Sequence, residues 1–258
     1  MTNTRRRILV TRPEPAASKT AEALEAEGYD PVVVPLFEIK PMPGVDSVVE
    51  KVLRDDPQAI AFTSANAIRA LMSSFTDSIP QTLLQLPVYA LGEATAIVSR
   101  DAGFATVLET PPDHGGDAKG LAAWITSRCE PGGGPILHLH GQHRAADLSV
   151  LLAGPGLQVT ARAIYVSQSA EPFTDSLRQH IANAPVVAVL HYSPRAARHF
   201  VERAAEIRIP CHACLSPAVA EALDQALIGR KIGAGSVVVA ELPNERALLR
   251  ALKQSDRR

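Results

Sequence analysis

The stretch Ile8-Leu9-Val10-Thr11-Arg12-Pro13 decides the fold, because its pattern returns at Ile136-Leu137-His138-Leu139-His140-Gly141, 128 residues later (136 − 8). Each copy is a short apolar run followed by apolar residues at helical spacing, over 16–27 and 145–152, which predicts a strand and then a helix. Residues 59–66 are echoed by 188–195, and 91–96 by 215–220. Four segments in the same order indicate an internal repeat. The alternative is that any two strand–helix units resemble one another.

Short β-rich runs alternate with helical stretches along the whole chain, which predicts an α/β fold with parallel sheets covered by helices on both faces. Residues 32–39 and 157–166 are each expected to form one long strand at the same place in its repeat, and Pro- or Ser-rich stretches follow both. We therefore expect the chain to cross twice between two domains. Domain 1 is expected to comprise residues 1–40 and 167–258, and domain 2 residues 41–166, including the second linker strand. Two adjacent linkers would form a hinge beside a cleft.

Composition excludes several classes of protein. Hydrophobic residues make up 46% of the chain and charged residues 21%, as in soluble globular proteins, and the formal net charge is −1. No basic field points to a nucleic-acid or membrane partner, so an anionic ligand must be met by local donors. Three cysteines cannot form a disulfide framework. No apolar stretch is long enough for a signal peptide or a membrane span, and we expect a cytoplasmic protein.

Hydroxyl side chains follow several of the expected strands, where open α/β sheets bind their ligands. They are Thr11, Thr63, Ser64 and Ser193, with Thr95 near the start of another helix. Each could simply cap a helix, as Ser and Thr commonly do. Together, hydroxyls and helix N-termini also form a surface that binds anions.

Three further residues extend this candidate site. Arg12 could add a fixed positive charge, although an ordinary surface arginine is the alternative. Arg144 follows the equivalent strand of the second repeat, where Gly141 permits a close approach of the backbone. Tyr165 lies near the end of the second linker strand and could reach the ligand, or else be an ordinary core or surface tyrosine.

Other patterns carry less weight. His138 and His140 are expected on opposite faces of a strand, with His143 nearby, and we expect no metal. The CxxC spacing of Cys211 and Cys214 reads better as a buried strand than as a redox motif. The glycines at 132–134 lack a P-loop lysine, so no cofactor is expected.

The sequences of these motifs, and their order along the chain, resemble those of the uroporphyrinogen-III synthase family. The similarity spreads over about residues 8–250 and includes Leu91-Gly92-Glu93-Ala94-Thr95-Ala96. The other matching segments are 8–13, 34–36, 62–67, 141–148, 165 and 192–194.

The resemblance implies two similar parallel-sheet, flavodoxin-like domains joined by a two-stranded β-ladder hinge. It implies a lyase that dehydrates and cyclises hydroxymethylbilane to uroporphyrinogen III, inverting ring D, without cofactor. Tyr165 matches the tyrosine proposed to assist departure of the hydroxyl group. The remaining matches would bind and orient the substrate: Thr11, Arg12, Thr63, Ser64, Thr95 and Ser193. A monomer is expected, and a transient contact with hydroxymethylbilane synthase is left open.

The chain departs from the family pattern at 215–220, where Ile-Gly-x-x-Thr-Ala is replaced by Leu215-Ser216-Pro217-Ala218-Val219-Ala220. Pro217 suits the first turn of a helix and Ser216 its cap, so Ser216 is the expected replacement contact. The alternative function is a non-catalytic tetrapyrrole-binding or sensing relative of the same fold. A periplasmic-type binding protein is disfavoured, because no signal peptide is expected.

Overall fold

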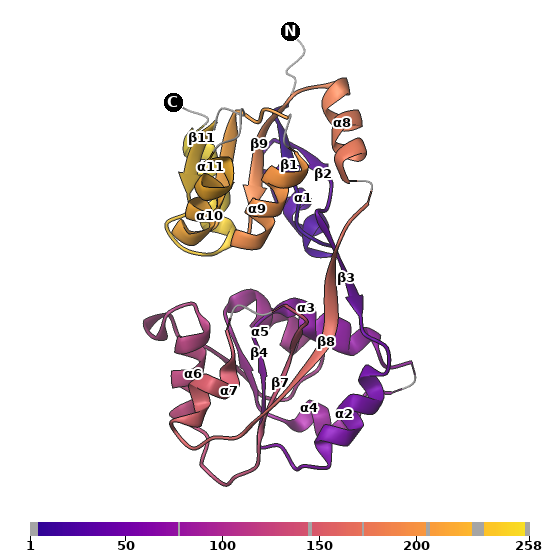
Figure 1. Cartoon of the computed structure of the whole chain (residues 1–258), viewed down its shortest axis with the longest axis vertical. Coiled ribbons are helices and arrows are strands. Elements are labelled where there is room, and N and C mark those ends of the chain that lie inside the picture. The colour runs from indigo at the N-terminus through magenta and orange to yellow at the C-terminus, as the bar shows by residue number, and fades with distance from the viewer. Residues whose placement is uncertain are drawn as a thin grey trace. The chain divides into compact units, whose positions relative to one another are not determined.

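The computed structural model describes residues 5–76, 78–143, 146–171, 173–204, 207–228 and 235–255. Contacts divide the chain into two units. Unit 1 comprises Met1–Glu38 and Gln168–Arg258, and unit 2 comprises Ile39–Ser167. Each unit has a sheet with helices on both faces (Figure 1).

Unit 1 contains a five-stranded sheet in the order β11-β10-β9-β1-β2, in which each pair of neighbouring strands is parallel. Its strands are β1 (Arg7–Val10), β2 (Asp30–Val33), β9 (Val186–His191), β10 (Cys211–Cys214) and β11 (Ser236–Val239). Its helices are α1 (Ala16–Ala26), α8 (Phe173–Asn183), α9 (Pro194–Arg203), α10 (Pro217–Leu227) and α11 (Glu245–Ser255).

The sheet of unit 2 has six strands in the order β3-β8-β7-β4-β5-β6. Its strands are β3 (Phe37–Pro41), β4 (Ala59–Phe62), β5 (Val88–Ala90), β6 (Val107–Glu109), β7 (Ile136–Gly141) and β8 (Val159–Ser169). Its helices are α2 (Val45–Leu53), α3 (Ala65–Ser73), α4 (Gln81–Gln85), α5 (Glu93–Asp101), α6 (Ala118–Thr126) and α7 (Leu148–Ala153), with a 3-10 turn at Pro112–His114.

The two sheets repeat one pattern, which confirms two similar, flavodoxin-like parallel sheets. Ordered by repeat position, both units follow 2-1-3-4-5: β2-β1-β9-β10-β11 in unit 1 and β8-β7-β4-β5-β6 in unit 2. Each unit therefore takes two strands from one sequence repeat and three from the other. The sequence echoes agree with this pattern. Two of them fall on the strand pairs β1 with β7 and β4 with β9, and the third, 91–96 with 215–220, directly follows β5 and β10.

The central strands are continuously apolar because helices cover both of their faces. In β4, Ile60 and Phe62 pack into the core on one face, while Ala59 and Ala61 pack into the core on the other. In β10, the sequence Cys211–Cys214 is fully buried, which confirms the reading of the CxxC spacing as a buried strand.

The expected single strand over 32–39 is wrong. It is two strands, since β2 ends at Val33 and β3 begins at Phe37. Pro35 between them has no N–H to donate to a ladder. The N–H of Met42 donates to the carbonyl of Ile164, and that of Ala170 to the carbonyl of Leu36. These bonds make β3 and β8 antiparallel neighbours, and both strands cross between the units.

Candidate functional site

In unit 1, three loops that carry polar side chains lie next to one another at the carboxyl edge of the sheet. This follows from the strand order, in which β9 lies between β1 and β10. The loop after β1 carries Thr11 and Arg12, the loop after β9 carries Tyr192 and Ser193, and the loop after β10 carries Ser216. The chain leaves β1 and β9 in opposite directions along the sheet, which is where doubly wound sheets form a ligand-binding crevice.

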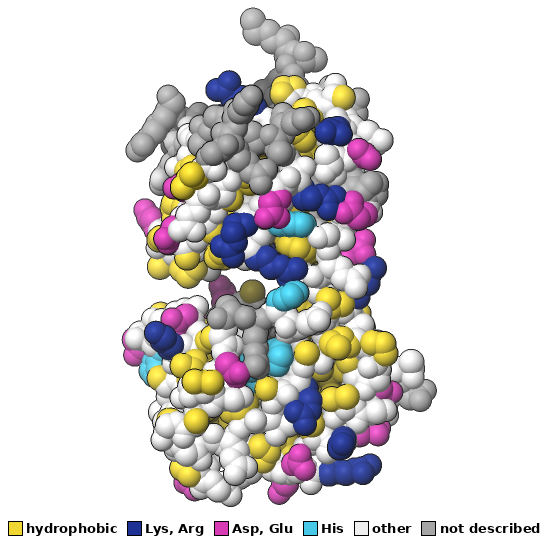
Figure 2. Space-filling view, viewed as in Figure 1, with side chains coloured by type: hydrophobic (Ala, Val, Ile, Leu, Met, Phe, Trp, Pro, Cys, Tyr) yellow, Lys and Arg dark blue, Asp and Glu magenta, His cyan; other side chains and the backbone are white. Residues whose placement is uncertain are grey.

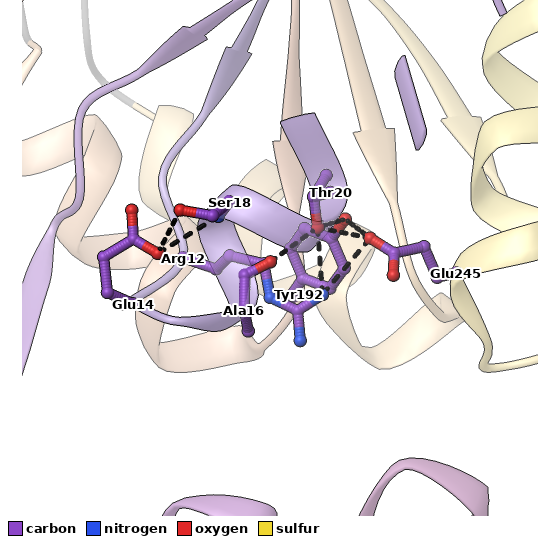
Figure 3. A network of polar contacts seen from close by, with 7 residues as sticks. All are labelled: Arg12, Glu14, Ala16, Ser18, Thr20, Tyr192 and Glu245. Carbon is purple, nitrogen blue, oxygen red and sulfur yellow. Dashed lines mark hydrogen bonds and ion pairs between the residues drawn. The ribbon is translucent and has the colours of Figure 1, made fainter. Parts of the chain in front are cut away.

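A polar network occupies the loops after β1 and β9 (Figure 3). One carboxylate oxygen of Glu245, at the start of α11, accepts hydrogen bonds from Arg12 Nη1 at 3.3 Å, from the Tyr192 hydroxyl at 2.9 Å and from the Thr20 hydroxyl. Arg12 Nη1 also donates to Thr20 Oγ1 at 3.2 Å. Its guanidinium carbon lies 4.1 Å from the centroid of the Tyr192 ring.

This network offsets part of the positive charge of Arg12 and fixes the orientation of its side chain. The ion pair with Glu245 offsets part of this charge and holds the side chain in one place. The hydrogen bonds to Thr20 and Glu245 both use Nη1, which leaves the other N–H donors of the guanidinium to a ligand, as far as the described residues show. Burial raises the pKa of the Tyr192 hydroxyl, and the Glu245 carboxylate raises it further, so Tyr192 is a neutral donor at physiological pH.

The hydroxyls of unit 1 differ in what they bond. Ser193 caps α9, accepting from the N–H of Ala196 at 3.1 Å, as the capping interpretation expects. Thr11 is buried, and its hydroxyl donates to the carbonyl of Leu190 at 3.3 Å. Ser216 occupies the cap position of α10 but makes no side-chain cap bond there. Ser216 is therefore the hydroxyl of the three that is available to a ligand.

The carboxyl edge of unit 2 carries the equivalent residues. Ser64 caps α3, accepting from the N–H of Asn66 at 3.2 Å, and the half-buried Thr63 precedes it directly after β4. Thr95 lies in the first turn of α5 with its side chain buried. Of the three, Thr63 is the side chain placed to contact a ligand directly.

Tyr165 lies in β8 at the same edge of the sheet, paired with Gly141 at the end of β7. Its ring belongs to the main core of unit 2 and is 9% exposed. Tyrosine combines an apolar ring with a polar hydroxyl, which suits a residue packed into the core beside a polar edge. Arg144, the other candidate of this repeat, lies outside the described residues.

The structure thus divides the expected site residues between two sheets. Unit 1 gathers Thr11, Arg12, Ser193 and Ser216, and unit 2 gathers Thr63, Ser64, Thr95 and Tyr165.

Sequence reasoning missed three members of the Arg12 network. Tyr192 stood in a motif already noted, whereas Thr20 and Glu245 carried no signal. Arg195, in the first turn of α9, was also missed, and its guanidinium carbon lies 4.4 Å from the centroid of the Phe37 ring. Basic side chains gather over α9 on the face in Figure 2, and acidic side chains are interspersed with basic ones elsewhere on it.

The expectation that His138 and His140 lie on opposite faces is wrong. Residues two apart in a strand share a face, and the two rings lie 4.8 Å apart, both buried. Nδ1 of His140 lies 2.7 Å from the carbonyl oxygen of Gly141 and must donate to it. Within the described ranges, no three His, Cys, Asp or Glu side chains are grouped to hold a metal ion. Those ranges also contain no helix long and apolar enough to cross a membrane.

Comparison with known proteins gives one family. The family model described as uroporphyrinogen-III synthase HemD matches residues 18–250. The fold is similar to a uroporphyrinogen-III synthetase from Helicobacter pylori, with a TM-score of 0.64 and 19% identity over 97% of this chain and 99% of that one. A mutant uroporphyrinogen III synthase from Thermus thermophilus gives a TM-score of 0.54 and 15% identity over 98% and 99% of the two chains. No curated protein matches the chain.

Proposed function

The chain belongs to the uroporphyrinogen-III synthase family, and from that premise we propose that it is a lyase acting on hydroxymethylbilane. The reaction removes water from this linear tetrapyrrole and closes it to uroporphyrinogen III with ring D inverted. The observation that carries the proposal is the family match over residues 18–250 of a chain whose two sheets both end in hydroxyls and helix N-termini.

The chemistry of these edges supports a ligand with many carboxylates. Backbone N–H groups at the starts of α3, α5, α9 and α10 are donors with a partial positive charge, and they bind carboxylates without lysine or arginine. Arg12 adds one cation that is already oriented by Glu245. Such a surface can hold a polycarboxylate on a chain whose net charge is −1.

We assign the bond-breaking step to Tyr165. Its phenol would donate a proton to the departing hydroxyl group, which leaves as water. The electrophilic carbon that remains is attacked by the substituted carbon of ring D, which gives a spiro intermediate. The older bond from that ring carbon to the bridge of ring C then breaks and re-forms at the free carbon of ring D, and the proton lost from that carbon returns to the phenolate. Positioning by the protein, more than acid strength, selects this attack over the simpler closure to the uninverted isomer.

The remaining residues bind and orient the substrate in this proposal. Arg12, Thr63 and Ser216 are placed for direct contact, whereas the buried Thr11 and Thr95 and the capping Ser64 and Ser193 hold the loops that present those contacts. We also propose that the β3–β8 pair acts as the hinge between the units.

The deciding experiment supplies fresh hydroxymethylbilane to the purified protein and resolves the oxidised products as type I and type III isomers. We expect type III in clear excess over the enzyme-free control. Tyr165→Phe, which keeps the ring and removes the hydroxyl, should lower kcat by roughly 10²-fold, the range of general acid catalysis. Type I alone at the spontaneous rate would instead leave a non-catalytic tetrapyrrole-binding relative.

A further inference from the structure

A β-bulge interrupts the pairing of β7 with β8 next to Tyr165. His140 pairs with Ala163, but Gly141 pairs with Tyr165, so Ile164 is an extra residue in β8. Neighbours in a regular strand point to opposite faces. Here Ile164 and Tyr165 both join the same buried cluster. The bulge therefore re-aims the tyrosine, as bulges beside active sites commonly do.

The ring of Tyr165 lies against the α-carbon of Gly141. A β-carbon built on Gly141 would lie 2.6 Å from Cζ of Tyr165, 2.8 Å from Cε2 and 2.9 Å from the hydroxyl oxygen. These distances are well inside van der Waals contact. Gly141 does not have a positive φ, so this position requires glycine for space and not for backbone conformation.

The backbone on the Gly141 side of this contact is held by its own hydrogen bonds. The N–H of Gln142 donates to the carbonyl of Tyr165 at 2.8 Å, and Nδ1 of His140 donates to the carbonyl of Gly141 at 2.7 Å. The two strands cannot separate without losing the first of these bonds. An added methyl group would therefore push the outer atoms of the ring and not the sheet.

We propose that Gly141 is a positioning residue, which sets where the Tyr165 hydroxyl stands at the carboxyl edge of unit 2. The proposal rests on the function proposed above, in which that hydroxyl assists the departing group. Gly141 itself touches no substrate in this account. Because glycine has no side chain, the phenol ring of Tyr165 can pack against the end of β7.

The experiment compares the wild type with Gly141→Ala, Tyr165→Phe and the double variant, measuring kcat, KM and the fraction of type III isomer. We expect Gly141→Ala to lower kcat by about 10- to 100-fold, since displacements of the order of 1 Å have such effects, and to change KM by less than about twofold. In the Tyr165→Phe background the same change should lower kcat by no more than about twofold. Gly154→Ala is the matched control, because a β-carbon there meets no atom within 4 Å.

A second measurement reports the ring directly. In protein labelled with 3-fluorotyrosine, Tyr165→Phe assigns one of the four tyrosine resonances, and Gly141→Ala should shift that resonance most. If Gly141→Ala folds poorly, Tyr165→Leu should restore its thermal midpoint, because the shorter side chain removes the clash.

The outcomes separate the two proposals. A wild type that yields only type I isomer refutes the proposed function. If the wild type is active and Gly141→Ala is equally active, the role of Gly141 is refuted. The role is also refuted if Gly141→Ala lowers kcat by the same factor in the wild-type and the Tyr165→Phe backgrounds. An unmoved Tyr165 resonance refutes it in every case.

Discussion

Lowering the pH from about 7.5 to about 5 should destabilise unit 1, because two neutral histidines are buried side by side in it. His191 ends β9 and His212 lies in the neighbouring β10, with His191 Nε2 and His212 Nδ1 3.0 Å apart. The rings stack with their centroids 5.3 Å apart, and Phe200 of α9 packs edge-on against both. Nδ1 of His191 has no hydrogen-bond partner among the described residues. A proton added to this nitrogen would be both buried and unsolvated.

The magnitude follows from the pKa values. Burial and, to a smaller extent, the neighbouring His212 lower the pKa of His191 to about 3. Burial also lowers the pKa of His212 to about 4, against an opposing effect of Asp224 in α10. Both lie below the unfolded value of about 6.5, so the unfolded chain binds more protons and stability falls as the pH drops below that value. At pH 5 each histidine accounts for about 2 kcal/mol, or about 4 kcal/mol for the pair.

Urea unfolding at the two pH values, followed by far-UV circular dichroism, measures this loss. His212→Gln is the informative variant, because its pH-dependent loss should be about half that of the wild type, whatever the substitution costs at neutral pH. Trp124, the only tryptophan, lies in unit 2, so its fluorescence reports the other unit as an internal control. Equal pH-dependent losses in wild type and variant would refute the reasoning, as would a wild type more stable at pH 5.

Three further predictions test other parts of the molecule, two of them with a control variant. Glu245→Ala releases the arginine that it holds, so KM for hydroxymethylbilane should rise by about 5- to 20-fold, a loss of 1–2 kcal/mol, with a smaller change in kcat. The exposed Glu25→Ala should leave both unchanged, and equal KM values would contradict the orienting role. Ser193→Ala removes a helix cap and should lower the free energy of unfolding by about 1 kcal/mol. Ser216→Ala loses no cap bond and should change the free energy of unfolding by less than about 0.5 kcal/mol. Denaturant titration of both variants measures this difference. Gly120→Ala should cost about 1–3 kcal/mol in the same titration, because its β-carbon would lie 2.0 Å from a backbone carbonyl oxygen, and a wild-type midpoint would contradict the packing.

Much of the fold could be predicted from the sequence because the signals are local or periodic. Apolar runs, helical spacing and the cap residues depend only on neighbours along the chain, and they identified the parallel α/β architecture and the repeat. The candidate hydroxyls also followed from local position, since Ser64 and Ser193 each come two residues after the end of a buried strand and begin a helix. The prediction at 32–39 was wrong because the apolar residues on both sides of Pro35 were assigned to a single strand.

The contacts that define the site were beyond such reasoning. Arg12 and Glu245 are 233 residues apart, and they meet because the start of α11 lies beside the loop that follows β1. A sequence motif identified Tyr165 as a candidate. Its packing on Gly141 depends on a β-bulge that no local sequence pattern in β8 predicts.

By itself, the sequence determined which segments are strands and helices, because hydrophobic periodicity and capping act over a few residues. Only the tertiary structure decided which distant residues meet. Strand order and register determine these contacts between distant residues. A shift of one residue in the register of a strand would turn every one of its side chains to the other face of the sheet.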